Sequence, residues 1–170
     1  LLRNRGSDGF PGFFEDATEA AGVSLEQFTI DRFDELEDKK RRSFFSDGVY
    51  SFSAVFADFD DPPDAWPDLL VVSDFGASAM FWNNGDGTFT EGTRSAGLGL
   101  EENGMGVAVA DFDGDGRLDM YLTGIFRPKS NLRHMPTYLP FGNLGNMLYR
   151  NLGGRRFASH RSDTTHISEA

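Results

Sequence analysis

The sequence contains no cysteine and no apolar run long enough to cross a membrane as a helix. The absence of cysteine excludes disulfide bonds, thiolate zinc sites and a cysteine nucleophile. A membrane-spanning helix needs about 20 consecutive apolar residues, whereas the longest candidate, around residues 69–73, has the length of a strand. Hydrophobic residues still make up 39% of the chain and include 17 Phe. This content is sufficient for a packed core and argues against a disordered chain.

Basic residues are also scarce, with 16 Lys and Arg against 27 Asp and Glu, for a net charge of −11. A chain this acidic is a poor partner for nucleic acid, because the phosphates repel it. The short basic run at 39–42 does not reverse that balance. Many of the acidic residues lie in two short segments, which favours metal sites over a merely solvated surface.

Common catalytic motifs are absent as well. The sequence has no Gly-x-Ser-x-Gly elbow, His-Glu-x-x-His pair, P-loop or Gly-x-Gly-x-x-Gly loop. The three histidines, at positions 134, 160 and 166, show no metal-ligand spacing, so we interpret them as surface residues. We therefore expect this chain not to be an enzyme by itself.

The chain repeats itself internally. The sequence Ala-Asp-Phe-Asp occurs at 57–60 and again at 110–113, each time after small apolar residues and before further aspartates and an apolar run. A second element, an Asn-x-Gly turn followed by Phe, occurs within residues 2–14, 81–89 and 148–157. The two Ala-Asp-Phe-Asp copies start 53 residues apart, and repeats of that length indicate an array of similar structural units.

The turn chemistry predicts an all-β fold. Asn-Gly, Asp-Gly and Gly-Gly pairs separate short apolar segments, as tight hairpins require. A unit of about 50–60 residues is the size of one four-stranded antiparallel blade of a β-propeller, and blades must stack to bury their faces. We predict that the whole chain, 1–170, is a partial propeller of about two to three blades. One unit ends near residue 22, a blade covers about 48–97, and a truncated blade covers about 104–170.

Two insertions interrupt the repeats, at about 24–45 and 127–146. The first predicts a helix over about 24–42, because Ser24 and Gln27 form a capping box and basic residues come late in the segment. It is either a solvated insertion or a partner-binding helix. The second insertion contains three prolines and predicts a long loop.

The second acidic loop, residues 111–119, carries the strongest chemical signal. Its carboxylates lie at loop positions 1, 3, 5 and 9, which are Asp111, Asp113, Asp115 and Asp119. Ca²⁺ takes six to eight hard oxygen ligands, and the interspersed glycines permit the sharp turn that makes the carboxylates converge. The main-chain carbonyl of Arg117, at position 7, is a further predicted ligand. An apolar segment follows where an EF-hand has a helix and a Glu. The alternative interpretation is a solvated acidic turn.

The first acidic loop, residues 58–68, departs from this pattern. Two extra residues and a Pro-Pro pair stand in place of the glycine turn. The four carboxylates are retained, as Asp58, Asp60, Asp64 and Asp68, with Trp66 at the carbonyl position. Asp61 is an alternative ligand. We predict calcium here too, and the alternative is a degenerate loop held by hydrogen bonds alone.

At these loops the sequence resembles the FG-GAP/VCBS repeats of integrin α-chain propellers and of many bacterial secreted proteins. The segments 104–111, 69–76 and 146–151 are most similar to the cartilage acidic protein family and its bacterial relatives. The resemblance covers about residues 48–157 and 2–22. It implies a propeller of about six to eight blades, calcium loops between adjacent strands, and extracellular roles in adhesion, matrix or glycan binding, and scaffolding.

Two functions follow as expectations. The first is a calcium-binding extracellular module for protein or glycan binding, adhesion or scaffolding. Its partners are an extracellular protein or glycan, other subunits of an assembly, or remaining blades from the same or another chain. The alternative is the propeller portion of a secreted carbohydrate-active enzyme, such as a polysaccharide lyase. The chain starts without Met or a signal peptide, so we interpret it as a processed chain or a fragment of a secreted, periplasmic or cell-surface protein.

Overall fold

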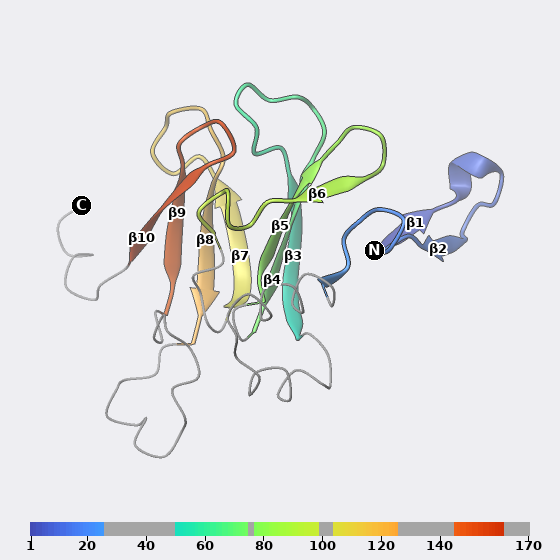
Figure 1. Cartoon of the computed structure of the whole chain (residues 1–170), viewed down its shortest axis with the longest axis horizontal. Helices are drawn as coiled ribbons and strands as arrows, with labels where there is room; N and C mark the ends of the chain where they lie inside the picture. The colour runs from blue at the N-terminus through green and yellow to red at the C-terminus, as the bar shows by residue number, and fades with distance from the viewer. Residues whose placement is uncertain (26–49, 75–76, 99–103, 126–144, 162–170) are drawn as a thin grey trace, which may run out of the picture.

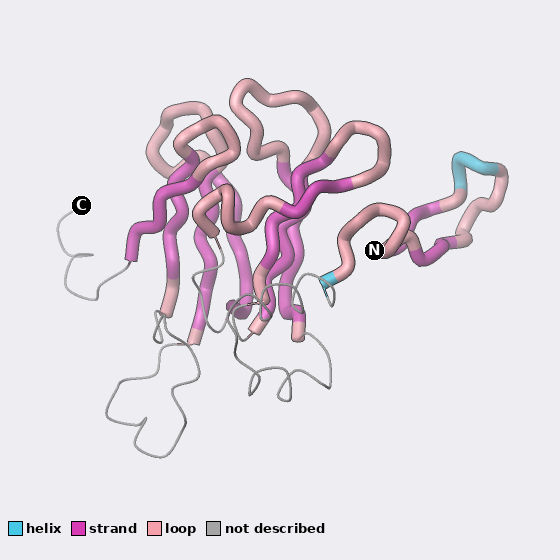
Figure 2. Tube along the Cα trace, viewed as in Figure 1, coloured by secondary structure: helices cyan, strands magenta, loops and turns pink. Residues whose placement is uncertain are grey.

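The computed structural model describes residues 1–25, 50–74, 77–98, 104–125 and 145–161. Almost all regular structure in these ranges is strand (Figure 2). None of the described helical segments is long and apolar enough to span a membrane. The predicted all-β class is confirmed.

Two predicted segments fall outside this description. The helix expected over about 24–42 lies beyond it except for the first two residues, and the 127–146 insertion lies beyond it except for the last two.

Eight of the strands form two four-stranded antiparallel sheets, which confirms the predicted blade architecture (Figure 1). The first blade runs in the order β3 (Ser51–Ala57), β4 (Asp68–Ser73), β5 (Ala79–Asn83) and β6 (Phe89–Glu91). The second blade has the same order: β7 (Gly104–Ala110), β8 (Asp119–Gly124), β9 (Met147–Asn151) and β10 (Phe157–Arg161). Both begin with an irregular register near the start of the first strand, at 51–53 and 104–106.

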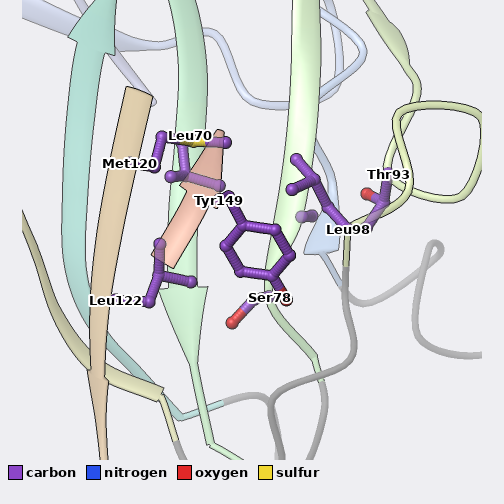
Figure 3. A pocket seen from close by; sticks show the side chains of 8 residues that line it. Leu70, Ser78, Thr93, Leu98, Met120, Leu122 and Tyr149 are labelled. Atoms are coloured by element: carbon purple, nitrogen blue, oxygen red, sulfur yellow. The ribbon is translucent and has the colours of Figure 1, made fainter. Parts of the chain in front are cut away.

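The two blades stack through an apolar core. Alternation along the strands places one set of side chains from each blade in the space between them. All are at most 4% exposed: Leu70, Val72, Met80 and Trp82 from the first blade, and Met120, Leu122, Met147 and Tyr149 from the second. The Tyr149 ring lies in this interior, which Leu70, Leu122 and Ser78 also line (Figure 3). Burial of each such side chain stabilises the fold by about 1.5–3 kcal/mol.

The opposite face of the first blade packs against the N-terminal segment. Leu69, Val71 and Phe81 form a second buried cluster with Ala21 and Val23. The central strand β4 is therefore buried on both faces, which explains why its sequence is a continuous apolar run rather than an alternating one.

A short hairpin precedes these blades. It pairs β1 (Leu2–Asn4) with β2 (Phe14–Asp16) around a 3₁₀ turn, η1 (Gly6–Asp8). Its Asn-x-Gly turn matches those of the β5–β6 and β9–β10 hairpins, so it corresponds to the outer two strands of a blade.

The segments that follow β2 and β6 link their own unit to the next one in the same way. The Ala21 carbonyl accepts a 2.8 Å hydrogen bond from the Phe89 backbone N–H, and the Ala96 carbonyl accepts one of 2.8 Å from Phe157. Each alanine precedes a glycine, Gly22 or Gly97, with φ of +72° or +78°. A Cβ on Gly97 would lie 2.8 Å from the Phe157 carbonyl oxygen, so a side chain has no room there.

Candidate metal centres

Both acidic loops join the first two strands of their blade, and both lie at the same end of the stacked sheets (Figure 1). The β5–β6 and β9–β10 turns lie at that end as well. Antiparallel meanders require this arrangement, because alternate connections fall on the same rim. The candidate metal ligands of both blades therefore gather on one rim.

The second acidic loop brings three of its four carboxylates together. Asp111, Asp113 and Asp115 each offer a ligand oxygen within 4.8 Å of the others, and all three residues are exposed. The Asp111 carboxylate accepts backbone N–H bonds from Gly114 at 2.7 Å and from Gly116 at 2.9 Å. Both glycines have positive φ, so they wind the backbone around Asp111 as the sequence predicts.

The first acidic loop brings its carboxylates together in the same way, although its sequence differs. Asp58, Asp60 and Asp64 form an equivalent cluster, with ligand oxygens within 4.8 Å. The Asp58 carboxylate accepts the N–H of Ala65 at 2.8 Å, just as Asp111 accepts that of Gly116. Ala65 adopts φ +67°, a left-handed conformation that costs an alanine about 1–2 kcal/mol. The extra residues and the prolines are thus accommodated without loss of the cluster.

The fourth aspartate of each loop is placed differently. Asp68 and Asp119 are 0% and 1% exposed and start the strands β4 and β8. The Asp119 carboxylate accepts the N–H of Phe112 at 3.0 Å and that of Asn151 at 2.7 Å. The structure does not bring these two residues into the three-carboxylate clusters. Their observed role is to tie the loop to the third strand of the blade.

Asp68 makes the matching contacts in the first blade. Its carboxylate accepts the N–H of Phe59 at 3.1 Å and that of Asn83 at 2.9 Å. Burial raises the pKa of Asp68 to about 6, although both of these hydrogen bonds act to lower it. The Asp60 carboxylate nearby also raises this pKa, because a second negative charge disfavours ionisation.

Two asparagines have a larger role than the sequence suggested. The Asn151 side-chain oxygen accepts the Gly153 N–H at 2.9 Å, which forms the β9–β10 turn. Its amide group donates to the Phe59 carbonyl of the first blade at 2.9 Å. The first blade repeats the turn contact with Asn83 and Gly85. The recurring Asn-x-Gly motif is the sequence signal for these residues, and it predicts the hairpin turn but not the contact between blades.

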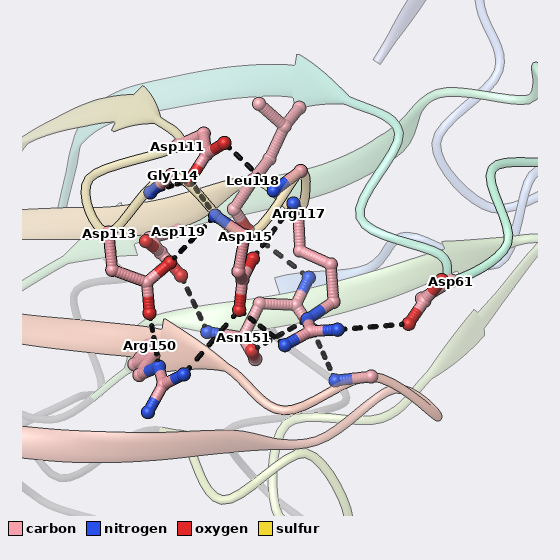
Figure 4. A network of polar contacts seen from close by, with 12 residues as sticks. Asp61, Asp111, Asp113, Gly114, Asp115, Arg117, Leu118, Asp119, Arg150 and Asn151 are labelled. Carbon is pink, nitrogen blue, oxygen red and sulfur yellow. Dashed lines mark hydrogen bonds and ion pairs between the residues drawn. The ribbon is translucent and has the colours of Figure 1, made fainter.

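Arginines pair with two of the three carboxylates of the second cluster (Figure 4). Arg150, on β9, forms an ion pair with Asp113 and lies 3.6 Å from Asp115. The Arg117 guanidinium contacts Asp115 and lies 3.4 Å from Asp61 in the first loop. The backbone N–H of Arg117, with the two arginine charges, lowers the pKa of Asp115. Asp115 is thus held in the ionised form that a metal ligand needs.

The first cluster is paired across the blades. Arg155, in the β9–β10 turn, donates to both oxygens of Asp60, at 2.7 and 2.9 Å. Its guanidinium also lies over the Trp82 ring, 5.0 Å from the centroid. Both partners belong to the first blade, so this contact spans the blade junction.

Trp66 is half-exposed at 52% and its indole lies against Gly85, where a Cβ would be 3.1 Å from Nε1. Coordination through the main-chain carbonyls of Trp66 and Arg117 stays a prediction. Asp61, considered an alternative ligand, instead lies beside Arg117.

The clusters fit Ca²⁺ in chemistry and in size. Oxygens that bind one ion at about 2.3–2.6 Å lie at most about 5 Å apart, and the oxygens of each cluster meet that limit. Each cluster consists of carboxylates and contains no His or Cys, the donors typical of zinc sites. The donor set is therefore that of a hard cation.

Comparison with known proteins supports the repeat assignment. Residues 63–122 match the family model of the FG-GAP-like repeat. Cartilage acidic protein 1 of Homo sapiens is 32% identical over 92 residues, which is 54% of this chain and 13% of that protein. The Mus musculus protein of that name is 30% identical over 93 residues, covering 54% of this chain and 14% of the relative. The Xenopus tropicalis protein is 39% identical over 54 residues, 31% of this chain and 8% of the relative.

The chain thus spans no more than 14% of the length of these relatives. The match over 63–122 begins inside the first acidic loop and ends in β8, so it contains the complete second loop. Together with the two stacked four-stranded blades, these similarities support an FG-GAP repeat fold.

Proposed function

We propose that this chain is a calcium-stabilised, extracellular β-propeller module that binds a protein or glycan partner. The observation that carries the proposal is the pair of three-aspartate clusters, each with ligand oxygens within 4.8 Å, on one rim of two stacked blades. The similarity to cartilage acidic protein 1 and the FG-GAP-like repeat support an extracellular setting.

Calcium would act on the loops themselves. Three carboxylates held this close repel one another, and a divalent cation removes that repulsion. Asp111, Asp113 and Asp115 would hold the ion in the second loop, and Asp58, Asp60 and Asp64 would hold it in the first. Because each loop joins the first two strands of a blade, a filled loop would fix the rim that meets the partner.

We further propose that this part of the chain is not catalytic. The clustered carboxylates are engaged by arginines and by backbone N–H groups, as expected of structural loops rather than of a free acid and base. The alternative, the propeller portion of a secreted carbohydrate-active enzyme, would place the chemistry elsewhere in a longer protein.

Calorimetric titration with Ca²⁺ after EDTA treatment, with thermal unfolding in parallel, tests the calcium proposal. A ligand that binds only the folded state stabilises it, by about 2.7 kcal/mol at 100 times its Kd. We expect binding heat and a higher Tm for the unaltered chain. Asp115→Asn should abolish the heat of calcium binding to the second loop, because it removes a charged ligand.

Asp86→Asn is the matched control. The Asp86 carboxylate accepts the N–H of Thr88 at 2.9 Å, and the Asp115 carboxylate accepts that of Arg117 at 3.0 Å. The two substitutions therefore remove the same charge from the same kind of turn, but only one lies in a cluster. Absence of heat and of a Tm change in a folded, unaltered chain would refute the calcium proposal.

A further inference from the structure

We propose that Arg155 is a built-in counter-ion of the first acidic loop, which competes with calcium for Asp60 and joins this loop to the second blade. The inference rests on the proposed function only in naming calcium as the competitor. The contact itself is a two-pronged ion pair, with Nε 2.7 Å and Nη2 2.9 Å from the two Asp60 oxygens. Both oxygens of this predicted ligand are thus already engaged by a cation of the protein.

The position of Arg155 is fixed by the surrounding fold. Its guanidinium lies over the ring of Trp82, which is 4% exposed, and a planar guanidinium both stacks on an aromatic ring and forks to a carboxylate. The Trp82 ring also packs so tightly on Gly92 that a Cβ there would lie 2.0 Å from Nε1. Arg155 itself has φ +59°, which is unusual for a residue other than glycine. The guanidinium is therefore held in place before any metal arrives.

Asp60 is well placed to make this pair strong. Its side chain is 13% exposed, against 33% for Asp113, the equivalent ligand in the second loop. The partner of Asp113 is Arg150, which is about as exposed as Arg155, 46% against 40%, but comes from the same blade. Displacing Arg150 would leave the blade junction unchanged, whereas displacing Arg155 would remove a contact between blades.

The first blade has no counterpart of Arg155. Four residues after its turn asparagine, where the second blade has Arg155, it has Gly87. The competition is therefore a property of this one junction and not of the repeat in general.

The test compares Arg155→Gln with Arg156→Gln, a control that removes the same charge from the next, exposed residue. Both substitutions are made in a chain that also carries Asp115→Asn, so that the heat of calcium binding comes from the first loop alone. We expect Arg155→Gln to bind calcium about tenfold more tightly than Arg156→Gln, because the metal no longer has to displace a paired guanidinium. Equal or weaker binding, or no binding by either variant, would overturn the competition.

A second measurement examines the ion pair without calcium. In EDTA, Asp60→Asn and Arg155→Gln should each lower the Tm. The decrease in Tm of the double variant should be smaller than the sum of the two single decreases. Additive losses would overturn the role of Arg155 as counter-ion. The proposed function is judged separately, by calcium binding to the second loop of the unaltered chain, so failure of one proposal is distinguishable from failure of the other.

Discussion

The first acidic loop has eleven residues from Asp58 to Asp68, and the second has nine from Asp111 to Asp119. Both nevertheless gather three carboxylates in the same way, and both place their last aspartate under two backbone N–H groups. They differ in what surrounds them. In the first loop, Phe59 and Asp60 contact Phe157 and Arg155 of the second blade, whereas Phe112 of the second loop is half-exposed. The comparison shows that the local loop sequence sets the cluster, whereas the arginine partner comes from the neighbouring blade in the first loop and from the same blade in the second.

The largest expected difference concerns the phenylalanine at loop position 2. Phe59 is 0% exposed and meets Phe157 edge to face, with centroids 5.9 Å apart. The equivalent Phe112 is 50% exposed. We expect Phe59→Ala to lower the free energy of unfolding by about 3–5 kcal/mol, and Phe112→Ala to change it by about 0.5 kcal/mol or less. Urea denaturation of the two variants measures both effects, and similar losses would contradict the stacking of the blades.

A smaller effect concerns the pH dependence of the first loop. The raised pKa of Asp68, about 6, exceeds the value of about 3.9 for an unfolded aspartate. The folded state therefore holds this proton more tightly, so ionised Asp68 costs stability above about pH 6. That cost disappears as the pH falls from about 6 to about 4.

The ¹³C shift of the Asp68 carboxyl, followed against pH in EDTA, should have its midpoint near 6. Asp60→Asn should lower the midpoint, because the Asp60 charge helps to raise it. A midpoint near 4 in the unaltered chain would show that the two N–H bonds outweigh burial.

The smallest expected effect concerns the left-handed residue of each loop. Gly116 has φ +87° and Ala65, its equivalent, has φ +67°. We expect Gly116→Ala to destabilise the chain by about 1 kcal/mol and Ala65→Gly to stabilise it by up to about 1 kcal/mol, because only glycine adopts this conformation without strain. Thermal unfolding of both variants gives the signs. The same sign for both would show that the loops do not close in the same way.

Sequence reasoning predicted the features that local pattern determines. The alternation of carboxylates and glycines at 111–119, and its distorted copy at 58–68, located both clusters. The Asn-x-Gly turns located the outer hairpins of the blades. Each of these signals lies within about ten residues, where turn geometry and strand period limit the outcome.

The contacts between blades were not predictable in this way. Arg155 and Asp60 are 95 residues apart, and Arg117 and Asp61 are 56 apart, so no local period relates them. The role of Asp68 and Asp119 was also missed in part. Their spacing fits position 9 of a calcium loop, but that position begins a buried strand, and burial there directs both oxygens to backbone donors.

The connectors determine how the molecule responds to mechanical tension. The Ala96 carbonyl, which ends the first blade, is bonded to the first residue of β10, the outermost strand of the second. The Ala21 carbonyl holds β6 in the same manner. A force that pulls an outer strand away must therefore also extract the connector of the preceding unit. The outer strand of each blade is therefore held by the preceding unit as well as by its own sheet. In an extended array of such units, peeling one outer strand would require breaking contacts with the preceding unit too.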